Sequence, residues 1–389
     1  MKKTSRILLW VLVVVIVLVA VALLVLPAQV EKGMNKVYPR TPYQATTQAL
    51  ELHKKLLIAD MHSDSLLWDR NLLKRNAYGH VDIPRLIEGN VAIQAFTIVT
   101  KTPKDMNYSR NEATSDNITT LAIVQLWPIS TWGSLKERAL YQARRLNRYA
   151  ERSDGTFVLI KSAADLRNYL ERRKSDAHIT AGFLGIEGAH ALEGDLQNID
   201  VFYDAGVRMM SPTHFFDNDI AASAHGITHG GLTEKGKEMI QRMEAKHMIL
   251  DLAHASPKTI ADALSIVKRP VVVSHTGVSG FCESPRNLTD EQIRGIAKTG
   301  GVICIGYWDE AVCGTDVKAI AHAIKYAVDV AGIEHVGLGS DYDGATTVPF
   351  DTSGLVELTA ALMDEGFKEP EIERIMGGNV IRLLEENLP

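Results

Sequence analysis

The stretch Leu56-Leu57-Ile58-Ala59-Asp60-Met61-His62-Ser63-Asp64 decides the fold of this chain, because a short apolar run ends there in polar, metal-seeking side chains. Apolar runs of the same design recur along the sequence, and they end at Glu187, His254, His275 and Asp341. A short run that is apolar on both faces is typical of a buried parallel strand. In a (β/α)8 barrel the functional groups lie at the carboxyl ends of such strands. We therefore expect these side chains to meet at one rim.

Strand-like segments alternate with helical segments from about residue 47 to the C-terminus. The helix starts carry capping signals at Thr233, at Ser256-Pro257, and at Thr289 with Gln292 three residues later. Further helices are expected at 316–330 and 370–386. We predict a single (β/α)8 TIM-type barrel over residues 47–389, an α/β fold. Its eight strands are expected at residues 56–62, 91–98, 179–187, 207–213, 248–252, 270–274, 301–307 and 335–340.

A helical insertion of about residues 101–155 separates the second and third strands, and it is longer than an ordinary crossover. It contains Trp127 and Trp132, a basic helix at 134–152, and then a minor strand at 157–160 outside the barrel. We expect the insertion to cap or flank the site, or to serve as an association surface. The basic helix is interpreted as a solvated face, with contact to anionic lipid as the alternative.

The N-terminus carries twenty consecutive apolar residues, 7–26, preceded by Lys2, Lys3 and Arg6. A helix of this length spans the roughly 30 Å hydrocarbon core of a bilayer, and the cations favour a cytoplasmic N-terminus. We predict a membrane anchor at 1–28, a tether at 29–46 and an extracytoplasmic catalytic domain. The alternative is secretion after cleavage of a signal peptide. The run is longer than the roughly 7–15 apolar residues of a signal peptide, which favours the anchor.

Composition excludes some classes of protein. Hydrophobic residues make up 46% and charged residues 23%, as in a globular enzyme with a large core. A net charge of −5 without a basic run disfavours nucleic acid as a partner. Cys304 is expected to be a buried thiol, whereas the spacing of Cys282 and Cys313 permits a disulfide without requiring it. Homodimerisation is left open.

The strand-end residues have the chemistry of a two-metal site. His62 and Asp64 project to the same side of an extended strand, so both can bind one ion. His254 and His275 end adjacent strands and can bind a second ion, while Glu187 can bridge the two. Imidazole and carboxylate ligands suit Zn²⁺. Two such ions about 3.5–4 Å apart would hold a shared water and polarise a carbonyl.

Asp341 is placed where a base could take a proton from that water and pass it to a leaving amine. Asp343 is interpreted as its support, because the position at the strand end favours Asp341 over Asp343. These residue types together predict a metal-dependent hydrolase.

The order of these motifs resembles the membrane dipeptidase family, the renal-dipeptidase-like zinc peptidases of the amidohydrolase superfamily. The resemblance covers about residues 56–387. The segments that carry it are Asp60-Met61-His62-Ser63-Asp64, Gly185-Ile186-Glu187-Gly188-Ala189-His190, Thr213-His214, Asp251-Leu252-Ala253-His254-Ala255-Ser256, Ser274-His275-Thr276, Ser284-Pro285-Arg286-Asn287 and Gly339-Ser340-Asp341-Tyr342-Asp343-Gly344.

The resemblance implies a binuclear zinc dipeptidase that hydrolyses the peptide bond of dipeptides through a metal-bridging water. It implies two Zn²⁺ per chain, bridged by Glu187, with Asp341 binding the water and shuttling its proton. His214 would stabilise the oxyanion, and Arg286 would bind the terminal carboxylate of the dipeptide in a two-pronged fork. The remaining implied ligands are His62 and Asp64 on one ion and His254 and His275 on the other.

The chain also departs from that family's animal members. They have Asn where this chain has Ser63, and they use a C-terminal lipid anchor instead of an N-terminal helix. An alternative function is a related amidohydrolase that acts on a lactam, a lactone or an N-acyl amino acid. A non-catalytic barrel scaffold is disfavoured by the intact ligand set.

Three further histidines lie close enough to the motifs in the sequence to be candidates for a role at the site. His190 lies just after the Glu187 motif and is a candidate for orienting a metal ligand. His225 and His229 lie in a glycine-rich loop and are candidates for lining the entrance. Five histidines in helical or linking segments are expected to be solvated: His53, His178, His247, His322 and His335.

Overall fold

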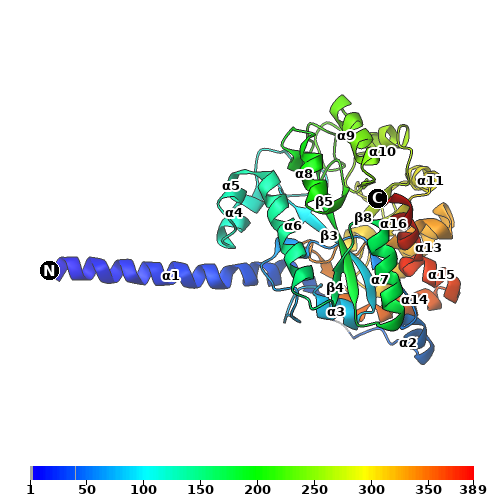
Figure 1. Cartoon of the computed structure of the whole chain (residues 1–389), viewed down its shortest axis with the longest axis horizontal. Coiled ribbons are helices and arrows are strands. Elements are labelled where there is room, and N and C mark those ends of the chain that lie inside the picture. The colour runs from blue at the N-terminus through cyan, green and yellow to red at the C-terminus, as the bar shows by residue number, and fades with distance from the viewer. Residues whose placement is uncertain (1–2, 40) are drawn as a thin grey trace.

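A curled parallel sheet forms the centre of the molecule, and helices surround it (Figure 1). The computed structural model describes residues 3–39 and 41–389. The strands of the sheet are β2 (Ile58–Asp60), β3 (Val91–Val99), β5 (Thr180–Glu187), β6 (Val207–Met210), β7 (Ile249–Leu250), β8 (Val272–Thr276), β9 (Val302–Ile305) and β10 (Val336–Leu338).

The eight strands follow the spatial order β7-β6-β5-β3-β2-β10-β9-β8, and every ladder between neighbours is parallel. A parallel bridge between Asp251 and Val272 links the two outermost strands. The predicted α/β architecture is therefore confirmed, and its curl is consistent with a TIM-type barrel. Because all strands run the same way, their carboxyl ends share one rim.

The strands form where the sequence is apolar on both faces. All nine residues of β3 and all eight residues of β5 are buried. The predicted minor strand is also present as β4 (Phe157–Leu159), which pairs with β5 outside the main path. A separate two-stranded sheet joins β1 (Lys36–Val37) to β11 (Thr347–Val348), which the sequence patterns did not indicate.

Helices cover the outside of the sheet, and their predicted caps are present. Thr233 accepts a hydrogen bond from the Gly236 backbone, and Thr289 forms a capping box with Gln292. The helices are α2 (Thr47–His53), α3 (Ile83–Glu88), α7 (Ala163–Ser175), α8 (Asn198–Asp204), α9 (Glu234–Ala245), α10 (Pro257–Leu264), α11 (Asp290–Lys298), α12 (Asp309–Val312), α13 (Val317–Ala331), α14 (Val356–Asp364), α15 (Glu369–Glu373) and α16 (Asn379–Asn387).

The single helix expected at 370–386 is interrupted. A π-helical segment, Arg374–Gly378, separates α15 from α16, with non-helical backbone at Gly377. A Cβ atom at Gly377 would lie 1.9 Å from the carbonyl oxygen of Leu57. The close approach to the chain just before β2 therefore requires glycine and explains the break.

The insertion contains α4 (Asn117–Val124), α5 (Ser130–Gly133) and the basic helix α6 (Leu135–Glu151). The prediction that the basic face of α6 is simply solvated is wrong for two arginines. Arg138 donates to the Thr100 carbonyl at 2.7 Å, and Arg145 donates to the Leu66 carbonyl at 2.7 Å. Both side chains are buried, and they attach the insertion to the segments that follow β2 and β3.

The N-terminal helix α1 (Lys3–Met34) extends away from the rest of the molecule (Figure 1). Pro27 lies inside it, and the helix includes the first residues of the predicted tether. Among the residues whose placement is described, no helix is both long and apolar enough to cross a membrane.

A disulfide joins Cys282 to Cys313, whose Cα atoms are 5.4 Å apart. The spacing had permitted this pairing without requiring it. Cys304 is a buried free thiol in β9, as expected.

Candidate metal centre

The strand-end residues of the sequence meet at the carboxyl rim of the sheet. His62 and Asp64 follow β2, Glu187 ends β5, His275 lies in β8, and Asp341 follows β10. His62 Nε2 lies 3.4 Å from Asp64 Oδ1, 3.8 Å from Glu187 Oε1 and 3.8 Å from Asp341 Oδ1. Side chains from four different strands thus share one small volume.

Glu187 is the centre of the second half of the cluster. Its Oε1 lies 2.9 Å from His254 Nε2 and 3.4 Å from His275 Nε2, and its Oε2 lies 3.1 Å from His214 Nε2. His214 was predicted to stabilise the oxyanion, and the structure places it as close to Glu187 as the predicted ligands. The sets able to converge on one ion are His62, Glu187 and His275; Glu187, His214 and His254; and His62, Asp64 and Asp341.

The residues present fit a metal centre. His62 Nε2 and Glu187 Oε1 are buried and have no hydrogen-bonding partner within residues 3–39 and 41–389. His254 Nε2 and His275 Nε2 face each other at 2.9 Å. Orphaned buried polar atoms are costly, and a cation between them would satisfy all of these nitrogen and oxygen atoms. Nitrogen and oxygen ligands of this kind suit Zn²⁺ and similar ions.

Polar side chains behind the cluster hold its members in place. Ser274 Oγ lies 3.1 Å from His62 Nδ1 and 3.0 Å from His275 Nδ1, so one hydroxyl orients two imidazoles. Thr97 donates to Asp64 Oδ1 at 2.6 Å. Partners of this kind set the tautomer and the orientation of metal ligands.

His225 orients His254, a role that the sequence did not indicate. Its Nε2 lies 3.1 Å from His254 Nδ1, and its Nδ1 lies 2.9 Å from the Tyr108 carbonyl oxygen. His225 is fully buried, so the expectation that it lines the entrance is wrong, whereas His229 in the same loop is exposed. No spacing in the sequence distinguishes the two histidines.

His190 does not orient a ligand. Its ring packs 4.8 Å from the Phe216 ring, and neither ring nitrogen has a hydrogen-bonding partner in the described part of the chain. Asp343 accepts hydrogen bonds from Ser65 Oγ at 2.5 Å and from the His80 backbone at 2.7 Å, and it also pairs with Arg70. It therefore supports the loop beside Asp341, as expected.

Burial sets the protonation of the cluster. It lowers the pKa values of His214, His254 and His275, which keeps these imidazoles neutral, as metal ligands must be. Burial raises the pKa of Asp341 to about 8. Burial alone would lower the pKa of His62, but the neighbouring carboxylates, Glu187 first, raise it, so the cluster favours positive charge at this position.

Arg286 lies beside the β8 edge of the cluster. It donates to the His275 carbonyl oxygen at 2.5 Å, and its Nε has no hydrogen-bonding partner among the residues described. The guanidinium is buried, and burial lowers its pKa. A buried arginine with an unpartnered donor in a cavity wall is suited to an anionic ligand.

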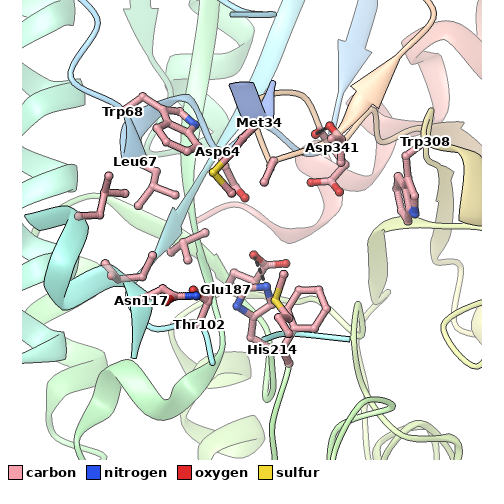
Figure 2. Close-up of a pocket in the computed structure, with 18 of the residues that line it drawn as sticks. Met34, Asp64, Leu67, Trp68, Thr102, Asn117, Glu187, His214, Trp308 and Asp341 are labelled. Carbon is pink, nitrogen blue, oxygen red and sulfur yellow. Dashed lines mark hydrogen bonds and ion pairs between the residues drawn. The ribbon is translucent and has the colours of Figure 1, made fainter. Parts of the chain in front are cut away.

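A cavity of about 710 Å³ opens onto the cluster. Figure 2 shows Asp64, Glu187, His214 and Asp341 around it, with Trp308 on one side. Its walls include both the metal-seeking residues and Arg286. A site of this size and mixed polarity is typical of small-molecule binding.

Residues 46–388 match the family model described as membrane dipeptidase, peptidase family M19. The chain belongs to the membrane dipeptidase family. It is accordingly a hydrolase of the metallo-dipeptidase type, and the resemblance noted in its motifs is confirmed.

Two curated relatives place this membrane dipeptidase family member among named dipeptidases. It is 27% identical to dipeptidase aclJ of Aspergillus oryzae over 350 residues, which cover 84% of this chain and 77% of that protein. It is 35% identical to the uncharacterized dipeptidase C965.12 of Schizosaccharomyces pombe over 213 residues, 51% of each chain.

Solved structures share the fold of this dipeptidase. The probable dipeptidase PvdM of Pseudomonas aeruginosa has a TM-score of 0.72 at 20% identity, covering 90% of this chain and 99% of that one. A metallo peptidase of Rhodobacter sphaeroides, liganded with a phosphinate mimic of the dipeptide L-Ala-D-Ala, has a TM-score of 0.68 at 24% identity, covering 85% and 99%.

Proposed function

We propose that this enzyme hydrolyses the peptide bond of dipeptides with two Zn²⁺ ions bridged by Glu187. The observation that carries the proposal is the position of Glu187, whose Oε1 lies 3.8 Å from His62 Nε2, 2.9 Å from His254 Nε2 and 3.4 Å from His275 Nε2. One carboxylate between two groups of ligands is the arrangement that a shared bridging ligand needs. The solved relative that holds a phosphinate dipeptide mimic supports the substrate class.

Each predicted ligand has a place in this scheme. His62 and Asp64 would hold one ion, and His254 and His275 would hold the other, as the motif order implies. When bound, the ions supply Lewis-acid chemistry that polarises the scissile carbonyl and activates water at neutral pH.

Asp341 is the proposed proton carrier. Burial raises the pKa of its carboxyl above the usual range of an aspartate, which favours a role as proton acceptor and donor. Its carboxylate lies 3.8 Å from His62 and faces the cavity. We assign it the removal of a proton from the attacking water and delivery of that proton to the leaving amine.

Two residues would hold the substrate. His214 lines the cavity next to Glu187 and is assigned to the oxygen of the scissile carbonyl. Arg286 is assigned to the C-terminal carboxylate, because its buried guanidinium has a donor to spare. A longer peptide would place its carboxylate beyond this reach, which accounts for a preference for dipeptides.

The experiment that tests the function is hydrolysis of a small substrate panel with and without a chelator, followed by readdition of Zn²⁺. The panel contains L-L and L-D dipeptides, a tripeptide and an N-acyl amino acid. We expect chelator-sensitive cleavage of dipeptides only, together with about two zinc ions per chain by elemental analysis. Cleavage of the acyl substrate alone would indicate the related amidohydrolase activity, and cleavage of none would indicate a scaffold.

Membrane attachment through α1 is a second part of the proposal. Every side chain from Ile7 to Leu18 is between 41% and 70% exposed, although all twelve are apolar. Such a continuous apolar surface favours burial in lipid, and the preceding cations favour a cytoplasmic N-terminus. We expect the full chain to stay in the membrane fraction after alkaline washing. Release of an enzyme that lacks residues 1–28 would instead indicate cleavage of a signal peptide.

A further inference from the structure

The last turns of α1 form part of the cavity wall. Pro27, Val30 and Met34 line the same cavity as the metal-seeking residues, and Figure 2 shows Met34 beside Asp64 and Trp68. These α1 residues precede the segment that matches the family, which begins at residue 46. The family match therefore assigns them no role.

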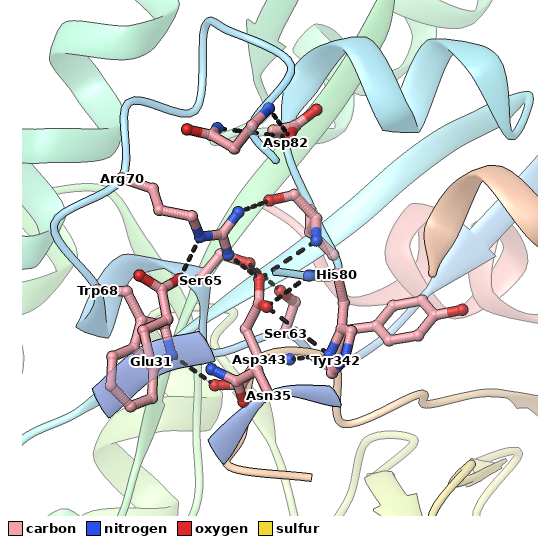
Figure 3. A network of polar contacts seen from close by, with 12 residues as sticks. Glu31, Asn35, Ser63, Ser65, Trp68, Arg70, His80, Asp82, Tyr342 and Asp343 are labelled. Carbon is pink, nitrogen blue, oxygen red and sulfur yellow. Dashed lines mark hydrogen bonds and ion pairs between the residues drawn. The ribbon is translucent and has the colours of Figure 1, made fainter. Parts of the chain in front are cut away.

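Specific contacts hold this part of α1 against the catalytic domain. Glu31 pairs with Arg70, which also pairs with Asp343, and all three side chains are buried (Figure 3). Asn35 Oδ1 accepts a hydrogen bond from the Ala345 backbone at 2.8 Å. Beyond it, β1 pairs with β11 in parallel register. The wall is thus held in place by contacts at Glu31 and directly after Met34, and it does not depend on the anchor alone.

The wall is apolar, and it faces other apolar residues. Val30 and Met34 are 43% and 45% exposed, so much of each side chain is free to contact a ligand. Leu67 and Trp68 from the segment after β2, and Ile118 and Leu121 from α4, line the same cavity. This compartment lies beside Asp64, whereas Arg286 lies at the β8 edge, bonded to the His275 carbonyl oxygen.

We propose that Val30 and Met34 determine specificity by binding an apolar side chain of the N-terminal residue of the substrate. This inference rests on the proposed dipeptidase function and on the assignment of the substrate carboxylate to Arg286. With the carboxylate at the β8 edge and the scissile bond over the cluster, the N-terminal residue lies toward Asp64 and the α1 wall. The cavity of about 710 Å³ exceeds the needs of a glycyl dipeptide, so it has room for a large side chain.

The test compares the full chain with its Met34→Ala and Val30→Ala variants on Leu-Gly and Gly-Gly. We expect kcat/KM for Leu-Gly to fall about fivefold to tenfold, mainly through KM, because apolar contact area is lost. Turnover of Gly-Gly should stay within about twofold, since glycine does not reach the wall. Met34→Trp should reduce Leu-Gly turnover too, by filling the compartment, and should spare Gly-Gly.

Val25→Ala is the matched control, because Val25 lies on the same helix, is 47% exposed and does not line the cavity. An equal fall in kcat/KM for both substrates, or the same fall in Val25→Ala, would contradict the proposal that Val30 and Met34 determine specificity. Unchanged Leu-Gly kinetics in all Met34 and Val30 variants would overturn it as well. Failure of the wild-type chain to cleave either dipeptide would instead reject the underlying dipeptidase function.

Discussion

Two residues of the centre have an unusual backbone. His254 has φ of 60° and Asp341 has φ of 59°, both in the left-handed region that non-glycine residues seldom adopt. His254 lies four residues after the end of β7, and Asp341 lies three residues after the end of β10. Such conformations cost on the order of 1 kcal/mol each, and they are concentrated at functional sites.

Arg286→Ala should reduce kcat/KM for dipeptides at least tenfold. Removing one partner of a buried, hydrogen-bonded charge pair costs about 2–5 kcal/mol. A dipeptide amide, which lacks the carboxylate, should be cleaved equally by variant and wild type. Steady-state kinetics on the acid and the amide check this, with zinc content measured to show that the cluster is intact.

Arg294→Ala is the control for Arg286, because Arg294 is exposed on α11 and forms a surface ion pair with Asp290 at 3.2 Å. An equal loss on the acid and the amide would show that Arg286 acts through the position of His275. It would then have no direct contact with substrate.

His225→Phe should weaken zinc binding. Phenylalanine can keep the stacking on Phe215, whose ring centroid lies 4.6 Å away, but it removes the hydrogen bond to His254 Nδ1. Loss of such an orienting partner lowers metal affinity about 10-fold to 100-fold. Competition with a chromophoric chelator measures the affinity, with His229→Phe on the exposed part of the loop for comparison. Unchanged affinity would show that His225 only packs.

At the scale of elements, the helix caps and the strands could be predicted from the sequence, because each depends on residues that are neighbours in the chain. The break at Gly377 and the burial of Arg138 and Arg145 in α6 could not be, because each depends on backbone from distant parts of the chain. The two arginines donate to carbonyl groups of distant segments, and Gly377 packs against the Leu57 carbonyl oxygen, so none of the three has a local signature in the sequence. The docking of α1 through Glu31 is a further example.

Docking of α1 should depend on pH through Glu31. Burial raises the pKa of Glu31 from 4.5 to about 7, in spite of the Arg70 guanidinium. Between pH 4.5 and about 7, the Glu31 carboxyl therefore keeps its proton in the folded protein, whereas the unfolded chain releases it. The contribution of Glu31 to the free energy of unfolding is therefore largest below pH 4.5. It decreases by about 3 kcal/mol as the pH rises to about 7.

Denaturant unfolding of wild type and Glu31→Gln at pH values from 4.5 to 8 measures this dependence. The stability of wild type relative to Glu31→Gln should decrease across that range and level off above pH 7. A Glu171→Gln variant, changed at a side chain that is 73% exposed, should follow wild type. A difference that does not vary with pH would mean that Glu31 stays charged in the folded protein.

At the scale of the whole molecule, the disulfide joins two loops of the functional rim. Cys282 follows β8 and Cys313 follows α12, so the bond links the loop before Arg286 to the segment that carries Trp308. The cysteines are separated by 31 positions, and closing a loop of that length stabilises the fold by about 3–4 kcal/mol.

Replacing both cysteines with serine should lower the unfolding free energy by about that amount. Chemical denaturation with and without reductant checks this expectation. Reductant should destabilise wild type and leave the double variant unchanged. Equal midpoints for oxidised and reduced wild type would contradict a stabilising role.

The sequence by itself determined the eight buried strands, most helix starts and the residues that meet at the rim. These follow from local patterns: apolar runs, capping residues, and polar groups placed where strands end. The tertiary structure alone decided that His225 orients His254, that His214 lies against Glu187, and that α1 supplies a cavity wall. Those relationships join residues far apart in the chain, and only the closing of the sheet brings them within reach of one another.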